Sequence, residues 1–159
     1  MVWLILIVRL SRTAPRQRRG VSRELAAAGA VSISDGVWAI PDTSFHRSVM
    51  KACSRRAVKA GGDLVMMSTS PESAPTHDFL EAALAEHLTS ESAALARRHA
   101  AYLAGNRTET PENFDVEVQN KTLEGLRLEA DRLSRKNVLE LEAVNTVVAS
   151  LRETAALPA

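Results

Sequence analysis

Four arginines near the start of the sequence are spaced so that a helix would carry them on one side. At intervals of 4, 3 and 4 residues, they are Arg12, Arg16, Arg19 and Arg23. At about 100° per residue they fall within about 60° of one another, almost opposite an apolar face. A guanidinium group binds phosphate through its charge and through paired hydrogen bonds. The spacing therefore predicts a helix whose outer side binds DNA phosphates or another anion.

A second basic stripe follows on the next predicted helix. At a constant spacing of four residues, its members are Arg47, Lys51, Arg55 and Lys59. Two helices on the same face of a sheet would present both stripes as one basic surface. Such a surface suits phosphate contacts, which supply affinity and salt dependence without reading base sequence. Two other interpretations stay open: binding of an acidic partner, either another protein or the chain's own acidic half, and a simply solvated helix face.

The start of the first helix also has the composition of a small oxyanion site. Ser11 and Thr13 offer hydroxyl groups, Arg12 and Arg16 offer charge, and the first backbone N–H groups of a helix have no partner within it. An ordinary capped helix start uses the same residue types. The sequence leaves both interpretations open.

No combination of residues makes a convincing catalytic or metal-binding set. The four histidines lie too far apart for a metal-ligand motif; they are His46, His77, His87 and His99. The glycine motifs of nucleotide-binding loops and the GxSxG motif of hydrolases are absent from the sequence. Cys53 falls on an apolar helix face, where we expect a buried thiol. We therefore expect a non-enzymatic protein with no metal and no cofactor.

The net charge of +1 conceals two regions of opposite sign. Residues 1–63 hold eleven Lys/Arg and four Asp/Glu, a net charge of +7, whereas residues 64–159 hold nine and fifteen, a net charge of −6. We predict a basic domain over 1–70, a linker over 71–76 and an acidic helical region over 77–159. A length of 159 residues and 45% hydrophobic content exclude a disordered tail. A single cysteine is typical of a reducing compartment, so we expect a cytoplasmic protein without membrane contact.

The basic region alternates strand and helix patterns. The predicted elements are a strand over 2–8, a helix over about 14–28, two strands within 30–40, a helix from Thr43 to Gly61 and a strand over 64–67. Asp35-Gly36 is a strong hairpin signal, and it argues against an all-parallel sheet. The order β-α-β-β-α-β predicts an α+β fold of the ferredoxin-like, split-βαβ type.

The acidic region has helical periodicity. We predict one helix over 77–104, a polar loop over 105–114 and a long helix over 116–156 with a coiled-coil-like heptad seam and a stutter at Asn137. The two helices would form a hairpin, and a second subunit would cover the rest of the seam, so we expect a homodimer. The seam positions expected to pack are Leu126, Leu133, Leu141 and Val148.

Several segments carry a resemblance to a known family. They are Trp3-Leu4-Ile5-Leu6, the run from Arg23 to Ala30 (RELAAAGA), the run from Asp35 to Pro41 (DGVWAIP), and the charged leucine-containing run from Leu126 to Arg135. Together they resemble the N-terminal domain of the ChrB family of chromate-resistance regulators. The resemblance implies chromate-responsive control of an efflux operon, with DNA binding and sensing of chromate or a similar oxyanion.

The sequence departs from that family in two respects. Ser22 stands where members commonly have an aromatic residue. Many members carry a further C-terminal domain, and we expect no counterpart of it within these residues. The same element order is also similar to the central domain of PaaX-type repressors and to small CRISPR-associated nucleases. Those nucleases need an aspartate at the end of the first strand, where this chain has Arg9-Leu10-Ser11. A regulator is therefore preferred to a protein-interaction module, and a metal-dependent nuclease is the third choice.

Overall fold

The computed structural model describes residues 1–10, 15–108 and 116–156. The chain divides into two compact units, Met1–His87 and Leu88–Ala159. The first unit contains β1 (Trp3–Arg9), α1 (Pro15–Ala27), β2 (Val31–Ser34), β3 (Val37–Pro41), α2 (Ser44–Lys59), β4 (Asp63–Thr69) and the first turns of α3 (Ala74–Thr108). The α+β class predicted from the sequence is confirmed.

The four strands form one antiparallel sheet in the order β2-β3-β1-β4. The apolar β1 is an inner strand, and its Ile5 lies opposite Ala39 on one side and Met67 on the other. The β2–β3 hairpin turns at Asp35-Gly36, where Gly36 has a φ of 76°, a conformation that favours glycine. Its carbonyl accepts a 2.8 Å hydrogen bond from the Val8 N–H, which ties the turn to β1.

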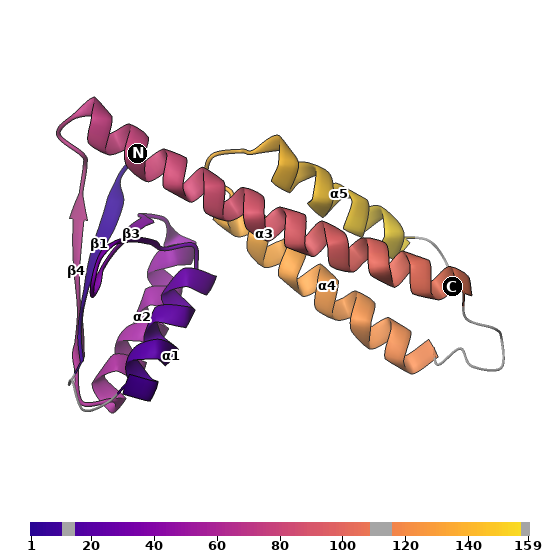
Figure 1. Cartoon of the computed structure of the whole chain (residues 1–159), viewed down its shortest axis with the longest axis horizontal. Coiled ribbons are helices and arrows are strands. Elements are labelled where there is room, and N and C mark those ends of the chain that lie inside the picture. Colours follow the sequence, from indigo (N-terminus) through magenta and orange to yellow (C-terminus); the bar gives the residue numbers. More distant parts are fainter. Residues whose placement is uncertain (11–14, 109–115, 157–159) are drawn as a thin grey trace. The chain divides into compact units, whose positions relative to one another are not determined.

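Both α1 and α2 pack on the same face of this sheet (Figure 1). The core between the layers is apolar and aliphatic, and its most buried large members are Leu4, Leu6, Leu25, Ile40 and Met50. Burying one such side chain contributes about 1.5–3 kcal/mol. On each helix the buried positions recur every three or four residues, and this core side determines which residues face outward; they are Val21, Leu25 and Ala28 on α1 and Met50, Cys53 and Ala57 on α2.

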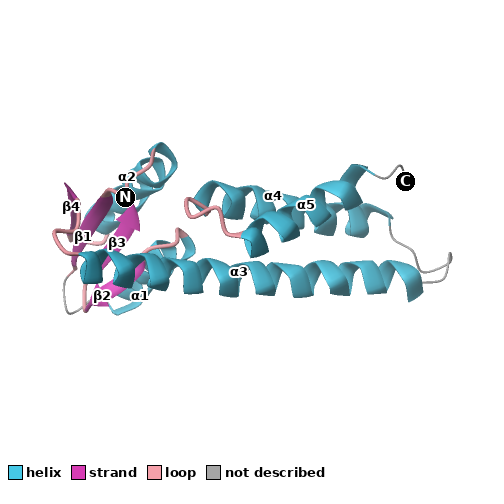
Figure 2. Ribbon diagram, turned by 90° about the horizontal axis from the view of Figure 1, so that it is seen from above, coloured by secondary structure: helices cyan, strands magenta, loops and turns pink. Residues whose placement is uncertain are grey.

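The second unit consists of the rest of α3 with α4 (Val116–Lys136) and α5 (Glu142–Ala156). The three helices run alongside one another (Figure 2). Their core is built from leucine, valine and alanine, among them Leu95, Leu126, Ala130, Leu133, Val144, Val148 and Leu151. Polar contacts also join the helices: the buried Lys136 amine donates to the Glu91 carboxylate at 2.6 Å.

The prediction of one continuous helix over 116–156 is wrong, because the chain breaks into α4 and α5 at Asn137. The Asn137 side chain accepts a 2.9 Å hydrogen bond from the Leu141 N–H and donates to the Asn145 side chain at 3.1 Å. Glu140 has a φ of 53°, which a continuing helix does not allow. The break lets α4 and α5 fold back against each other, so the hairpin lies within the segment predicted to be one helix.

Smaller differences concern α3 and the seam. The helix predicted over 77–104 begins at Ala74 and reaches Thr108, so its first turn overlaps the predicted linker over 71–76. Ser73 caps this start, because its side-chain oxygen accepts a hydrogen bond from the Thr76 N–H at 3.4 Å. Of the four seam positions, Leu126, Leu133 and Val148 are buried within the chain, whereas Leu141 is partly exposed beside the break.

Candidate functional site

The outer side of α1 carries three of the four predicted arginines. Pro15 begins the helix, a position that tolerates its missing N–H. Arg16, Arg19 and Arg23 are exposed, and the face opposite them buries Val21, Leu25 and Ala28. Arg12 lies outside the described residues, as do Ser11 and Thr13 of the predicted oxyanion site.

On α2, one member of the second basic stripe forms an ion pair and the other three do not. Arg47 makes a bidentate contact with Asp42, with one N–O distance of 2.6 Å, and Ser68 donates to the same carboxylate at 2.7 Å. These hydrogen bonds hold the pKa of Asp42 below its ordinary value. Lys51, Arg55 and Lys59 are also exposed, but no carboxylate among the described residues pairs with them.

A polar contact joins the two helices. Arg56 of α2 pairs with Glu24, the only acidic residue of α1, and the buried Cys53 thiol donates to the same carboxylate at 3.8 Å. Burial raises the pKa of the Cys53 thiol. Sequence reasoning missed this contact, although Arg56 stands one position off the Arg47–Lys59 stripe and Glu24 is a lone acid in a basic helix.

Together the two helices form what we call the cationic surface, defined as Arg16, Arg19, Arg23, Lys51, Arg55 and Lys59. All six are exposed, and no carboxylate within residues 1–10, 15–108 and 116–156 lies within 4.0 Å of their charged groups. Arg18, which lies between Arg16 and Arg19 in the sequence, has a guanidinium nitrogen 4.0 Å from a carboxylate oxygen of Asp35. The arrangement leaves six cations available to an external anion.

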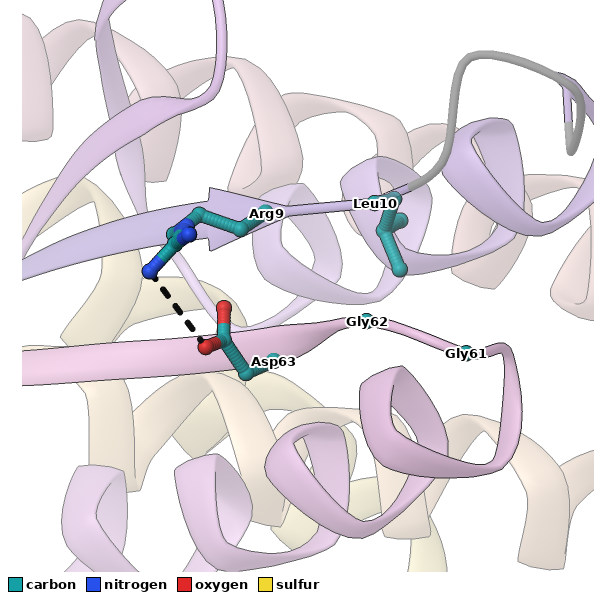
Figure 3. Close-up of a pocket in the computed structure, with 5 residues that line it drawn as sticks. All are labelled: Arg9, Leu10, Gly61, Gly62 and Asp63. Carbon is teal, nitrogen blue, oxygen red and sulfur yellow. Dashed lines mark ion pairs between the residues drawn. The ribbon is translucent and has the colours of Figure 1, made fainter.

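A separate hollow lies where β1 ends and β4 begins (Figure 3). It has a volume of about 490 Å³ and is lined by Arg9, Leu10, Gly61, Gly62 and Asp63. Arg9 and Asp63 point toward each other at 3.7 Å, so the hollow offers no net charge to a ligand. Gly62 is required by close packing, since a Cβ there would stand 2.1 Å from the Arg9 carbonyl oxygen.

The described part of the chain forms neither a metal-binding cluster nor a membrane-spanning helix. It contains no group of three or more His, Cys, Asp or Glu residues placed to hold a metal ion. None of its helices is both long enough and apolar enough to cross a membrane. His99 is buried among the helices of the second unit, donating to or accepting from Thr154 at 2.9 Å, and burial lowers its pKa.

Comparison with known proteins identifies the family. The family model described as "Protein ChrB, N-terminal" matches residues 18–157. The chain belongs to the ChrB N-terminal family. The resemblance drawn from the sequence motifs is therefore confirmed, and it supports a ChrB-like regulatory role in chromate resistance. No curated protein and no solved structure matches the chain.

The ChrB match spans parts of both units. It begins inside α1 and ends just beyond α5, so it includes Arg19 and Arg23 together with the whole of α2. β1 and Arg16 precede it. Five of the six members of the cationic surface therefore belong to the ChrB part of the chain.

Proposed function

We propose that this ChrB-type chain contacts the phosphate backbone of duplex DNA through its cationic surface, as a non-enzymatic, cytoplasmic component of chromate-responsive transcription control. The observation that carries the proposal is the set of six exposed cations without a carboxylate partner among the described residues. The element order and the strand order β2-β3-β1-β4 support a ferredoxin-like topology, which places both helices on one side.

The dimensions of the two helices suit a phosphate backbone. From Arg16 to Arg23 the rise is about 10 Å, and from Lys51 to Lys59 it is about 12 Å. One DNA strand carries a phosphate every ~3.4 Å along the duplex axis, so each helix can reach several of them. Contacts of this kind position a protein on DNA without reading its sequence.

Binding to a labelled duplex of arbitrary sequence tests the proposal. We expect the Arg19→Gln/Arg55→Gln variant to bind more weakly by about tenfold or more at low salt, since two phosphate contacts are lost. The matched control is Arg127→Gln/Arg135→Gln, which removes the same charge from exposed positions on α4. No binding by the unaltered chain at low salt would refute the proposal.

Competition separates DNA from an acidic protein partner. Unlabelled duplex should displace the labelled duplex, whereas poly-glutamate at equal total charge should displace it poorly. Equal displacement would favour the protein-interaction module instead. Cleavage of the duplex in Mg²⁺ would favour the nuclease.

We also propose that residues 11–16 bind chromate or a similar oxyanion, through Ser11, Arg12, Thr13 and Arg16. Chromate should raise the melting temperature more than sulfate at the same concentration and ionic strength. Arg12→Gln should abolish the difference. Equal shifts from the two dianions would mean general charge screening and would remove chromate sensing from this part of the chain.

A further inference from the structure

The two helices that carry the cationic surface run in opposite directions along the same face of the sheet. β1 and β3 are antiparallel neighbours, and the helix after each strand returns across the sheet, so α1 and α2 are antiparallel (Figure 1). The helices are in contact, because some of their Cα atoms approach within 8 Å and Glu24 pairs with Arg56. Packed helices have axes about 8–10 Å apart. The packing therefore fixes the distance between the two sets of cations.

The cations of each helix point away from the sheet. They form two rows: the α1 row is Arg16, Arg19 and Arg23, and the α2 row is Lys51, Arg55 and Lys59. At 100° per residue, the mean direction of each row lies about 170° from that of the buried residues on the same helix. Because both rows point straight outward, their separation is close to the distance between the helix axes, about 8–10 Å.

Duplex DNA also presents charge in two rows, one on each strand, with a groove between them. The minor groove is about 6 Å wide and the major groove about 12 Å wide. These widths are measured between the walls of a groove, and the phosphate charges lie somewhat farther apart than the walls. A row separation of about 8–10 Å therefore fits the minor groove and falls short of the major groove. To span the major groove both rows would have to splay outward, and fixing six long side chains in that way costs rotamer entropy.

We propose that the two rows bridge the minor groove of duplex DNA, with the α1 row on the phosphates of one strand and the α2 row on those of the other. The bridging arrangement rests on the proposed function, contact between the cationic surface and DNA, and adds which feature of the duplex the surface recognises. A helix is about 10–12 Å across with its side chains, so neither helix enters a groove about 6 Å wide. The surface lies over the groove and senses its width through the phosphates, without reading base edges.

Duplexes with charge left only at chosen phosphates test the bridging arrangement on the full chain. Three probes share one length and one sequence, and each keeps six charged phosphates, with neutral methylphosphonates at all other positions. In the minor-groove probe, three phosphates of each strand face one another across the minor groove. In the major-groove probe they face one another across the major groove, and in the one-strand probe all six lie on the same strand. At low salt we expect the minor-groove probe to bind at least about tenfold more tightly than either of the others.

Three variants that each lose two positive charges identify the rows. Arg19→Gln/Arg23→Gln removes most of the α1 row, so it should bind the minor-groove and one-strand probes nearly equally. Arg19→Gln/Arg55→Gln leaves two cations in each row, so it should bind every probe more weakly but keep the preference for the minor-groove probe. The matched control Arg127→Gln/Arg135→Gln should keep both affinity and preference. Far-UV circular dichroism and melting temperature establish that each variant is folded.

Failure of the bridging arrangement and failure of DNA binding give different results. Equal binding of the minor-groove and major-groove probes, or tighter binding of the major-groove probe, would overturn the bridging arrangement and leave DNA binding in place. Tightest binding of the one-strand probe would mean that the rows follow a single strand. Binding of unmodified duplex but of none of the three probes would also overturn it, since six phosphates would then not suffice. No binding of unmodified duplex would refute the proposed function itself.

Discussion

If the cationic surface binds DNA as we propose, the salt dependence of that binding is its sharpest consequence. Each phosphate neutralised by a lysine or arginine contributes about −0.9 to the slope of log affinity against log salt. If all six cations of the surface contact phosphates, the slope is about −5.4. Raising monovalent salt from 50 to 200 mM would then weaken binding by roughly 10³-fold.

The Arg19→Gln/Arg55→Gln variant removes two of the six contacts. Its slope should fall to about −3.6, so the same rise in salt should weaken binding by only about 150-fold. Fluorescence anisotropy of a labelled duplex at five or six salt concentrations measures both slopes. Arg127→Gln/Arg135→Gln, with the same change in net charge, should leave the slope near its original value.

Protein stability supplies an independent check on the same variant. Arg19 and Arg23 are like charges four residues apart, as are Lys51 and Arg55. Such pairs cost about 0.2–0.5 kcal/mol each, so removing Arg19 and Arg55 should leave the melting temperature unchanged or slightly raised. Weaker DNA binding therefore cannot be ascribed to unfolding. An unchanged salt slope, or an equal change in the α4 control, would refute the assignment of phosphate contacts to α1 and α2.

Three further predictions concern contacts within the individual units. Gly62→Ala should destabilise the chain by about 1–3 kcal/mol in urea unfolding, because the new Cβ would meet the Arg9 carbonyl at 2.1 Å, whereas Gly125→Ala, with nothing within 4 Å, should stabilise α4 by about 0.5–1 kcal/mol. Asn137→Ala should cost about 1 kcal/mol, because the N–H of Leu141 loses its acceptor; an unchanged stability would mean that the helix break does not depend on this cap. Arg47→Gln should raise the pKa of Asp42 toward 3.8 in an NMR titration. Because the native pKa of Asp42 is lowered, its contribution to stability is present above pH ~4 and is lost as the pH falls through the native value. A titration of Asp42 that is identical in both proteins would show that Arg47 does not stabilise the carboxylate.

The parts of the fold that follow from local pattern were predictable. The apolar run of β1, the Asp35-Gly36 turn and the glycines after α2 each depend on one or two neighbouring residues, and all appear where expected. The same is true of the outward side of α1, because the buried positions Val21 and Leu25 determine it.

The break at Asn137 was not predictable from periodicity. Apolar residues continue on both sides with helical spacing, and the stutter only marks a change of register. What decides the break is a set of hydrogen bonds from one side chain to Leu141 and Asn145, together with the turn at Glu140. These contacts depend on how α4 and α5 meet, which a heptad count does not contain. The pairing of Glu24 with Arg56 was hidden for the same reason, since it joins helices far apart in sequence.

The pattern of charge pairing separates residues that hold the fold from residues available to a partner. In the second unit, cations join helices to one another: Lys136 pairs with Glu91, Arg98 with Glu129, and Arg152 with Asp131. The pKa of Glu129 is lowered by its hydrogen bond from Arg98, as expected for a charge that contributes to packing.

The first unit uses its cations differently. Arg56 and Arg47 pair with Glu24 and Asp42, and these contacts anchor α2 to α1 and to the loop before it. The six cations of the cationic surface have no such carboxylate among the described residues, although they repel along each helix. Neither helix has an acidic residue in its first turn to offset that charge. An anionic partner would offset this repulsion on binding, which is why we propose that the cationic surface contacts a phosphate backbone.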